Sequence, residues 1–403
     1  MNTLRTEVRL DDDGRYAEVA VVQTAPPAHP VLRPHRIGVG LYDVGGSGIR
    51  LRRRVEVDLD PAVDKGRTVL DELAGEPAAR VLLVNDGDLT FAKLRLDSSS
   101  AAAVPQILPG LADPLARAVL WGETLDAVTD GERPVADLVS LILVALPAET
   151  EVVVVQDVLT LTRSLVDRYL DADARLAAQE HLARACDRML ASAPAGGSLQ
   201  LAAARGLVGA SVDTARLAGW LAGTDAPGGL AVDTELRWAV LRRLAVLGVA
   251  GEPEIAAEQS ADPSAAGAER AAACRAALPD PGAKERAWQV ISVDTVLSNR
   301  LVEASAAGLW QPEHADLTAS YVERYFAEMP AMARRRTAWV AERVAGLAYP
   351  RYAVAPRTRT LAAALLARDD LPPGLRRVVT DADDDLRRAL AVRGAARAAP
   401  STT

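Results

Sequence analysis

The chain has 403 residues, of which 49% are hydrophobic and 25% are charged, values typical of a globular protein with a buried core. This length exceeds the usual size of one domain, so two or three domains are expected. The formal net charge is −8, and aromatic residues do not interleave with a basic patch, which argues against a nucleic-acid partner. No stretch approaches the roughly 20 apolar residues of a membrane span, and the first residues lack the apolar core of a signal peptide. We therefore expect a cytoplasmic protein with no membrane partner.

The first hundred residues predict a small antiparallel β-sandwich. Short runs rich in Val, Leu and Ile alternate with Gly-, Pro- and Asp-rich turns, and Val55, Val57 and Leu59 fall on one face of their run. The runs lie at 18–24, 36–43, 49–59, 67–73, 79–85 and 89–97. We place a β-sandwich domain at 1–97 and a linker at 98–104, where small residues without a pattern precede a proline.

From 105 to 395 the apolar period is helical, which predicts a large all-α domain. Asp157 and Asp233 stand where helices would begin, whereas Gly248 and Pro330 stand where helices would end. The stripe expected after Asp157 is Val158, Leu161, Leu165 and Tyr169. Brief connections between successive helices favour antiparallel neighbours, hence an irregular HEAT- or armadillo-like superhelix. We expect residues 396–403 to form a disordered tail.

No catalytic or metal-ligating constellation is recognisable in the sequence. Cys186 and Cys274 are too few for a disulfide framework and lack C-x-x-C spacing, so we expect two small buried thiols. The four histidines are His29, His35, His181 and His314. None of them belongs to an H-E-x-x-H motif, and neither a phosphate-binding loop nor a G-x-S-x-G elbow occurs. The sequence therefore predicts no catalytic residue, no metal site and no cofactor in this chain.

One cluster of arginines is a candidate binding site. Residues 331–403 contain 14 arginines against 7 carboxylates, and Arg334, Arg335 and Arg336 are consecutive. Consecutive residues span nearly a whole helical turn, so a solvated helix surface is the simpler interpretation. The alternative is a site for the carboxylate of a peptide, because arginine pairs with carboxylates in a bidentate manner.

Six segments, taken together, resemble a known family. They are VLRPHRIGVGLYD (31–43), VLLVNDGDLTFAKLRLD (81–97), DPLARAVLWGETLDAV (113–128), ELRWAVLRRLAVLG (235–248), RAALPDPGAKERAWQVI (275–291) and LSNRLVEASAAGLWQPEHADLTASYVERYF (297–326). In this order they are similar to the C-terminal half of the aminopeptidase N family in its actinobacterial form, within the gluzincin zinc aminopeptidases. The resemblance extends from about Asn2 to Arg393.

The resemblance implies a role without chemistry of its own. Members of the family carry an N-terminal β-domain, a thermolysin-like catalytic domain, a small β-sandwich and a helical superhelix, so this chain would begin after the catalytic domain. It would enclose the active site, contribute to the binding and access of peptides, and work with a catalytic half in cis or as a separate chain. The zinc motif H-E-x-x-H, the further glutamate ligand, the G-x-M-E-N motif and the catalytic tyrosine have no counterpart here, so zinc would lie in the missing domain and this chain alone would be inactive. From the residues alone, a free-standing α-solenoid adaptor for peptides or proteins is the alternative.

Overall fold

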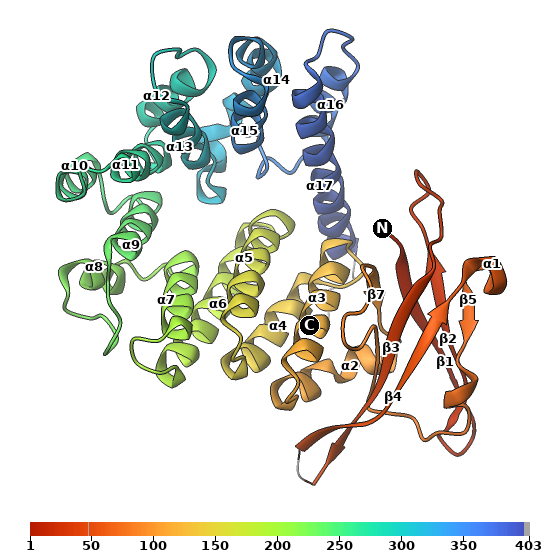
Figure 1. Ribbon diagram of the computed structural model, residues 1–403. Helices are drawn as coiled ribbons and strands as arrows, with labels where there is room; N and C mark the ends of the chain where they lie inside the picture. Colours follow the sequence, from red (N-terminus) through yellow and green to blue (C-terminus); the bar gives the residue numbers. More distant parts are fainter. Residues whose placement is uncertain (47, 399–403) are drawn as a thin grey trace. The chain divides into compact units, whose positions relative to one another are not determined.

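The computed structural model describes residues 1–46 and 48–398 (Figure 1). The chain divides into two compact units, unit 1 (Met1–Thr162) and unit 2 (Arg163–Thr403). Strands and short helices occupy the start of unit 1, and helices make up the rest of the described chain. The predicted α+β class, a small β-sandwich followed by a large helical region, is therefore confirmed. Within the described residues, no helix combines the length and the apolar character that a membrane crossing requires.

Unit 1 begins with two small sheets. The strands are β1 (Thr3–Leu10), β2 (Tyr16–Thr24), β3 (His35–Gly45), β4 (Gly48–Leu59), β5 (Arg67–Val69), β6 (Val81–Val84) and β7 (Lys93–Arg95). One sheet has the order β5-β2-β1-β7 and the other has the order β4-β3-β6. Neighbouring strands are antiparallel except for β1 and β7, which pair in parallel. The short helices between strands are α1 (Pro61–Asp64) and the 3-10 helix η1 (Asp71–Leu73).

Strand β1 is absent from the sequence-based prediction. Leu4 and Thr6 are both buried on its inner face, and the Thr6 hydroxyl donates a hydrogen bond to the Arg95 carbonyl at 3.1 Å. A threonine on the buried face interrupts the apolar alternation that identifies a strand, which explains the omission. The predicted run 67–73 is also divided, since β5 covers only its first residues and η1 follows.

The segment expected to be a linker is helical. Helix α2 (Ser98–Ile107) begins after Asp97, whose carboxylate accepts hydrogen bonds from the Ser99 and Ser100 amides. The hydroxyl of Ser100 is buried and accepts a hydrogen bond from the Leu82 amide of β6 at 2.9 Å. Ala103, Val104 and Ile107 are buried on the same face as Ser100, so the helix has a short apolar stripe, which the serines and alanines before it conceal in the sequence. The position of the domain boundary stays a prediction.

Unit 1 continues with helices that follow one another closely. They are η2 (Leu108–Gly110), α3 (Pro114–Thr129), α4 (Val135–Ala145), η3 (Leu146–Ala148) and the first part of α5 (Val152–Tyr169). Asp157 does not cap α5, because the helix begins five residues earlier. Leu161, expected on the buried stripe, is 50% exposed. Val158, Leu165 and Tyr169 are buried as expected, and Thr162 is the buried residue in place of Leu161.

Unit 2 is an array of helices. After the end of α5 come α6 (Ala172–Ser192), α7 (Ser198–Ala210), α8 (Thr214–Ala222), α9 (Thr234–Val246), α10 (Glu252–Ala261), α11 (Ala265–Ala277), α12 (Pro281–Ser292), α13 (Asn299–Leu309), η4 (Pro312–His314), α14 (Ala315–Arg335), α15 (Ala338–Ala348), α16 (Pro356–Leu366) and α17 (Pro373–Ala398). Helices α9, α11, α13, α15 and α17 form one row in which each packs on the next, and α12, α14 and α16 form a second row. Two rows are typical of α-solenoids, whereas the likeness to HEAT or armadillo repeats stays a prediction.

The helix ends in unit 2 agree with the sequence in part. The Asp233 carboxylate caps α9 by accepting a hydrogen bond from the Leu236 amide at 2.9 Å, and Gly248 follows the helix with a φ of 75°. Pro330, however, lies inside α14, which continues to Arg335 because Met329 and Met332 stay buried on both sides of the proline. Of the tail expected at 396–403, the first three residues belong to α17, and 399–403 lie outside the described residues.

Candidate functional site

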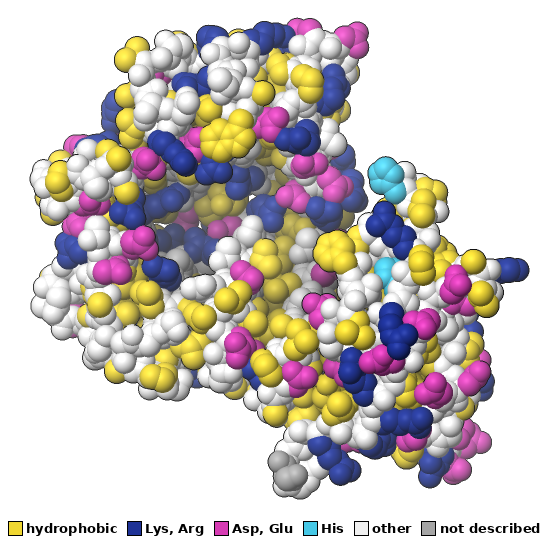
Figure 2. All heavy atoms as spheres, viewed as in Figure 1, with side chains coloured by type: hydrophobic (Ala, Val, Ile, Leu, Met, Phe, Trp, Pro, Cys, Tyr) yellow, Lys and Arg dark blue, Asp and Glu magenta, His cyan; other side chains and the backbone are white. Residues whose placement is uncertain are grey.

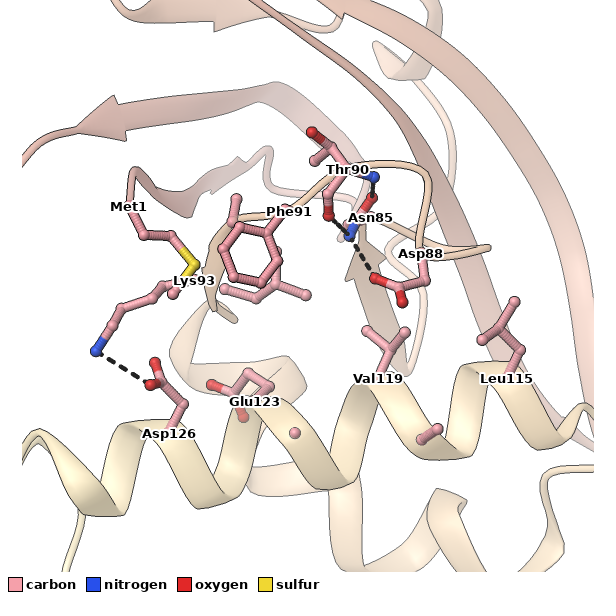
Figure 3. A pocket seen from close by; sticks show the side chains of 14 residues that line it. Met1, Asn85, Asp88, Thr90, Phe91, Lys93, Leu115, Val119, Glu123 and Asp126 are labelled. Carbon is pink, nitrogen blue, oxygen red and sulfur yellow. Dashed lines mark hydrogen bonds and ion pairs between the residues drawn. The ribbon is translucent and has the colours of Figure 1, made fainter. Parts of the chain in front are cut away.

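A pocket of about 350 Å³ lies in unit 1 between helix α3 and the segment that follows β6 (Figure 3). Its walls are largely apolar, and the larger apolar side chains are Met1, Phe91, Leu94, Leu115 and Val119. Polar side chains of the turn at 85–90 lie on one side of it, and carboxylates of α3 lie on another. The lining therefore has the composition of a binding surface, apolar with a few placed polar groups.

A tight turn places Phe91 at this pocket. Asn85 and Asp88 have φ values of 59° and 50°, and Gly87 has a φ of 86°, which these residue types tolerate. The Asn85 amide nitrogen donates to Asp88 Oδ1 at 3.2 Å and to the Thr90 carbonyl at 3.0 Å, and its oxygen accepts from the Thr90 amide at 3.2 Å. Asn85 itself is buried, whereas the Phe91 side chain is 84% exposed. The turn thus holds an aromatic side chain in solvent.

The same turn is anchored to strand β3. The Tyr42 hydroxyl donates to Asp86 Oδ1 at 2.9 Å, and the Asp86 amide donates to the Gly38 carbonyl at 2.9 Å. A side chain at Gly38 would bring Cβ within 2.3 Å of the Asp86 carbonyl, so only glycine allows this approach. Burial raises the pKa of the Asp86 carboxyl above its usual range, although Tyr42 and Arg54 oppose the shift. The turn is consequently fixed from the sheet side as well.

Ion pairs connect β7 to α3 beside the pocket. Lys93 Nζ lies 3.1 Å from Asp126 Oδ1, an interaction drawn in Figure 3. Arg95, whose side chain is only 3% exposed, pairs with Asp126 at 2.7 Å, with Asp130 at 2.6 Å and with Glu132 at 2.9 Å. A buried guanidinium with this many carboxylate partners is compensated for the loss of its hydration. These pairs fix the floor of the pocket relative to the sheet.

Glu123 is the buried carboxyl of this pocket. It is 4% exposed, its Oε1 accepts a hydrogen bond from the Leu96 amide at 3.4 Å, and Arg133 lies 3.6 Å from its Oε2. Burial raises its pKa above the usual range, and the charge of Arg133 only partly opposes this shift. One carboxyl can take up a proton, but the described residues that line the pocket include no histidine or cysteine to act with it. The pocket therefore fits binding better than catalysis.

In unit 2, a buried charged cluster joins segments that are distant in sequence. Arg163 Nε donates to Asp167 Oδ2 at 2.7 Å in α5, and Arg243 Nη1 of α9 donates to Glu313 Oε1 of η4 at 2.6 Å. Arg243 Nε also donates to the Ser211 carbonyl at 2.9 Å. Burial favours the neutral form of Glu313, but the charge and the hydrogen bond of Arg243 lower the pKa of that carboxyl below its usual range. Figure 2 shows that unit 2 is hollowed, with lysine or arginine side chains on the walls of the hollow.

Arg334 and Arg335 are the last residues of α14 and Arg336 follows the helix, so the cluster lies on the part of α14 beyond Pro330, where the sequence predicted that the helix would end. Arg334 Nη2 donates to Asp370 Oδ2 at 2.6 Å. Arg335 donates to a backbone carbonyl of the segment 292–299, and Arg336 donates to a side-chain oxygen of the same segment at 3.0 Å. All three arginines therefore connect α14 to other parts of unit 2. Their predicted role in holding a peptide carboxylate stays a prediction.

The two cysteines are buried, and His35 and His314 have hydrogen-bond partners within the chain. Cys186 and Cys274 are free and buried, as expected, and burial raises the pKa of each thiol to about 12, so both stay protonated. His35 Nδ1 is 2.7 Å from the Thr90 hydroxyl, and His314 Nε2 is 2.8 Å from a backbone carbonyl. Across residues 1–46 and 48–398, no group of three or more His, Cys, Asp or Glu side chains is placed to hold a metal ion.

Comparisons with known proteins identify the relatives of this chain. A family model described as the ERAP1-like C-terminal domain matches residues 81–388. Aminopeptidase N of Streptomyces lividans is 38% identical over 413 residues, which cover 99% of this chain and 47% of that protein. The chain thus spans about half the length of this curated relative.

Proposed function

The chain belongs to the family of ERAP1-like C-terminal domains, and on this premise we propose that it is the non-catalytic C-terminal region of a zinc aminopeptidase of the aminopeptidase N type. In this proposal it encloses the active site of a catalytic half, and it contributes to the binding and access of peptides. The observation that carries the proposal is the 38% identity to an aminopeptidase N over 99% of the chain. The catalytic half would correspond to the part of the Streptomyces relative that this chain does not match, which we call the unmatched part. Zinc would be held there. A cytoplasmic location belongs to the same proposal.

Unit 2 supplies the physical basis for the peptide-binding role. Its hollow carries cationic side chains (Figure 2), and a peptide whose N-terminus lies in an active site presents a carboxylate at its other end. Arg334 is 47% exposed at its side chain, and a guanidinium that bonds Asp370 has further N–H groups to offer. The ion pair of Arg243 and Glu313, whose side chains are 6% and 20% exposed, connects α9 to η4 within the same unit.

The carboxylate role of the arginines has a direct test. We expect replacement of Arg334, Arg335 and Arg336 by glutamine to weaken the binding of a fluorescent peptide with a free C-terminus about tenfold, since a charged hydrogen bond contributes roughly 1.5 kcal/mol or more. The same peptide with an amidated C-terminus should bind the variant and the unchanged chain equally. Arg357→Gln, at an arginine that is 74% exposed, is the matched control. Equal affinities for the free-acid peptide would remove the role from these residues.

The enclosing role predicts a dependence on peptide length. We expect this chain to raise kcat/KM of the unmatched part of the Streptomyces relative for every substrate, because it helps to enclose the active site. The increase should be larger for peptides of about ten residues than for dipeptides, because only the longer ones also reach unit 2. The free-standing adaptor, which is the alternative, would bind peptides without altering hydrolysis at any length. Rates that are independent of the added chain would therefore reject the accessory role.

A further inference from the structure

We propose that an apolar surface of unit 1, formed by Met1, Val31, Leu89, Phe91 and Leu115, is where the catalytic half docks. This inference rests on the proposed function. The exposed fractions of these side chains are 53%, 61%, 47%, 84% and 43%, in that order. We call this set the Phe91 surface. Single exposed apolar residues are ordinary, whereas several on adjoining segments mark an interaction site.

The five side chains belong to segments that hydrogen bonds hold together. Asn2, next to Met1, donates from its amide nitrogen to the Val31 carbonyl at 2.8 Å, and its backbone carbonyl accepts from the Lys93 amide at 2.8 Å. Met1, Phe91 and Leu115 line the same pocket (Figure 3). These hydrogen bonds and the shared pocket thus join the chain start, the loop that contains Val31, the segment of Phe91 and the first turn of α3.

Phe91 has the properties of a binding anchor. It projects from a turn that the side chain of Asn85 fixes through three hydrogen bonds and that His35 contacts through Thr90 at 2.7 Å. An exposed apolar side chain is unfavourable in the free chain, because water surrounds it. Since the turn already holds Phe91 in place, this side chain loses little conformational freedom when a partner binds. Aromatic anchors of this kind dominate the energy of protein interfaces.

The surroundings fit a protein partner. Lys93 and Asp126, which pair at 3.1 Å and are both partly exposed, form a charged border beside the apolar residues, the arrangement of an interface with an apolar centre and a polar rim. This chain corresponds to 47% of the Streptomyces relative, so in that protein more than half of the polypeptide is available to cover such a surface. The occupant we assign is therefore the catalytic half, rather than a second copy of this chain or a peptide.

Binding measured by calorimetry between this chain and the unmatched part of the relative tests the assignment. Phe91→Glu should weaken the complex at least about 30-fold, the effect of losing one dominant anchor. Val63→Glu, at a valine of helix α1 that is 79% exposed and outside the surface, is the matched control and should bind like the unchanged chain. Since Phe91 is so exposed, both variants should keep the melting temperature of the unchanged chain.

The outcomes separate this inference from the proposed function. If the unchanged chain binds and Phe91→Glu binds equally well, the Phe91 surface is not the docking site, although the accessory role stands. If sedimentation shows a dimer of this chain alone that Phe91→Glu dissociates, the occupant is a second copy and the assignment is wrong. If the unchanged chain neither binds the unmatched part nor alters its activity, the proposed function itself fails.

A second measurement applies if the unmatched part does not fold alone. The two parts are then joined in one polypeptide, in the order of the relative, and hydrogen exchange is compared with that of this chain by itself. Amides of residues 85–94 should exchange more slowly in the joined protein, whereas those of 62–64 should not change. Equal exchange at 85–94 in a joined protein that hydrolyses peptides would overturn the docking surface and leave the function in place.

Discussion

Lys284 provides a pH-dependent test of the packing in unit 2. It lies on α12, is fully buried, and its ammonium donates to the Ala276 carbonyl at 2.8 Å and to the Leu309 carbonyl at 3.0 Å. These carbonyls belong to the last turns of α11 and α13, so one side chain connects three helices. Burial, followed by the positive charge of Arg242, lowers the pKa of Lys284 from 10.5 to about 7.

The sign of the effect follows from proton counting. Between pH 7 and pH 10.5 the unfolded chain keeps the Lys284 proton while the folded chain has lost it, so the free energy of unfolding rises with pH in this window. The slope approaches about 1.4 kcal/mol per pH unit, and from pH 7.5 to 9.5 the gain is roughly 2.5 kcal/mol. Lys284→Met removes the titrating group, so we expect its stability to lack this gain.

The assay is urea unfolding followed by circular dichroism at several pH values between 7.5 and 9.5. The difference between the unchanged chain and Lys284→Met is the relevant quantity, because other titrating groups contribute to both. His314 is close by, and its pKa is lowered by burial and then by Lys284, so it titrates below the chosen window. Lys65→Met removes an exposed lysine and should keep the slope of the unchanged chain. Parallel stability curves for the unchanged chain and Lys284→Met would refute the reasoning.

Two further predictions concern stability. A Cβ at Gly308 of α13 would lie 2.3 Å from the Ala273 carbonyl of α11, so Gly308→Ala should destabilise unit 2 by about 1–3 kcal/mol. A Cβ at Gly122 of α3 would have no atom within 4 Å, so Gly122→Ala should stabilise unit 1 by about 0.5–1 kcal/mol. Thermal unfolding of both variants checks the pair, and equal shifts would contradict it. Arg243→Met leaves Glu313 without its partner and should lower the free energy of unfolding in urea by about 3 kcal/mol. The double variant, Arg243→Met with Glu313→Leu, should recover part of this loss. A loss below about 1 kcal/mol for the single variant would show that the pair is not needed for stability.

The elements that the sequence predicts well are those whose local signals agree. The helix from Thr234 to Val246 has a capping aspartate, an apolar stripe and a following glycine, and all three occur in the structure. Helix α2 has only a short apolar stripe behind a run of serines and alanines, and β1 has a threonine on its buried face, so the periodicity from which elements are inferred is weak in both. The local sequence pattern therefore identified the fold class, but it missed the elements that are positioned mainly by packing against other parts of the chain.

The candidate site was less predictable for a physical reason. The Asn85–Asp88 turn is evident from its residue types, but an aromatic residue just after a buried strand is ordinarily expected in the core. Phe91, one of only two phenylalanines in the chain, is exposed because the turn reverses the chain before it. Arg243 and Lys284 resemble surface residues in sequence, and their burial depends on carbonyls and a carboxylate that lie 8 to 70 residues away. Such partners follow from tertiary structure alone.

Hydrolysis of leucyl-p-nitroanilide tests the central claim most directly. The rate is measured for this chain alone, for this chain with added zinc, and for this chain mixed with the unmatched part of the Streptomyces relative. Our account predicts no hydrolysis by this chain alone, with or without zinc, and a rate on mixing that exceeds that of the unmatched part by itself. Zinc-dependent hydrolysis by this chain alone would contradict the account, and so would a mixture no faster than the unmatched part.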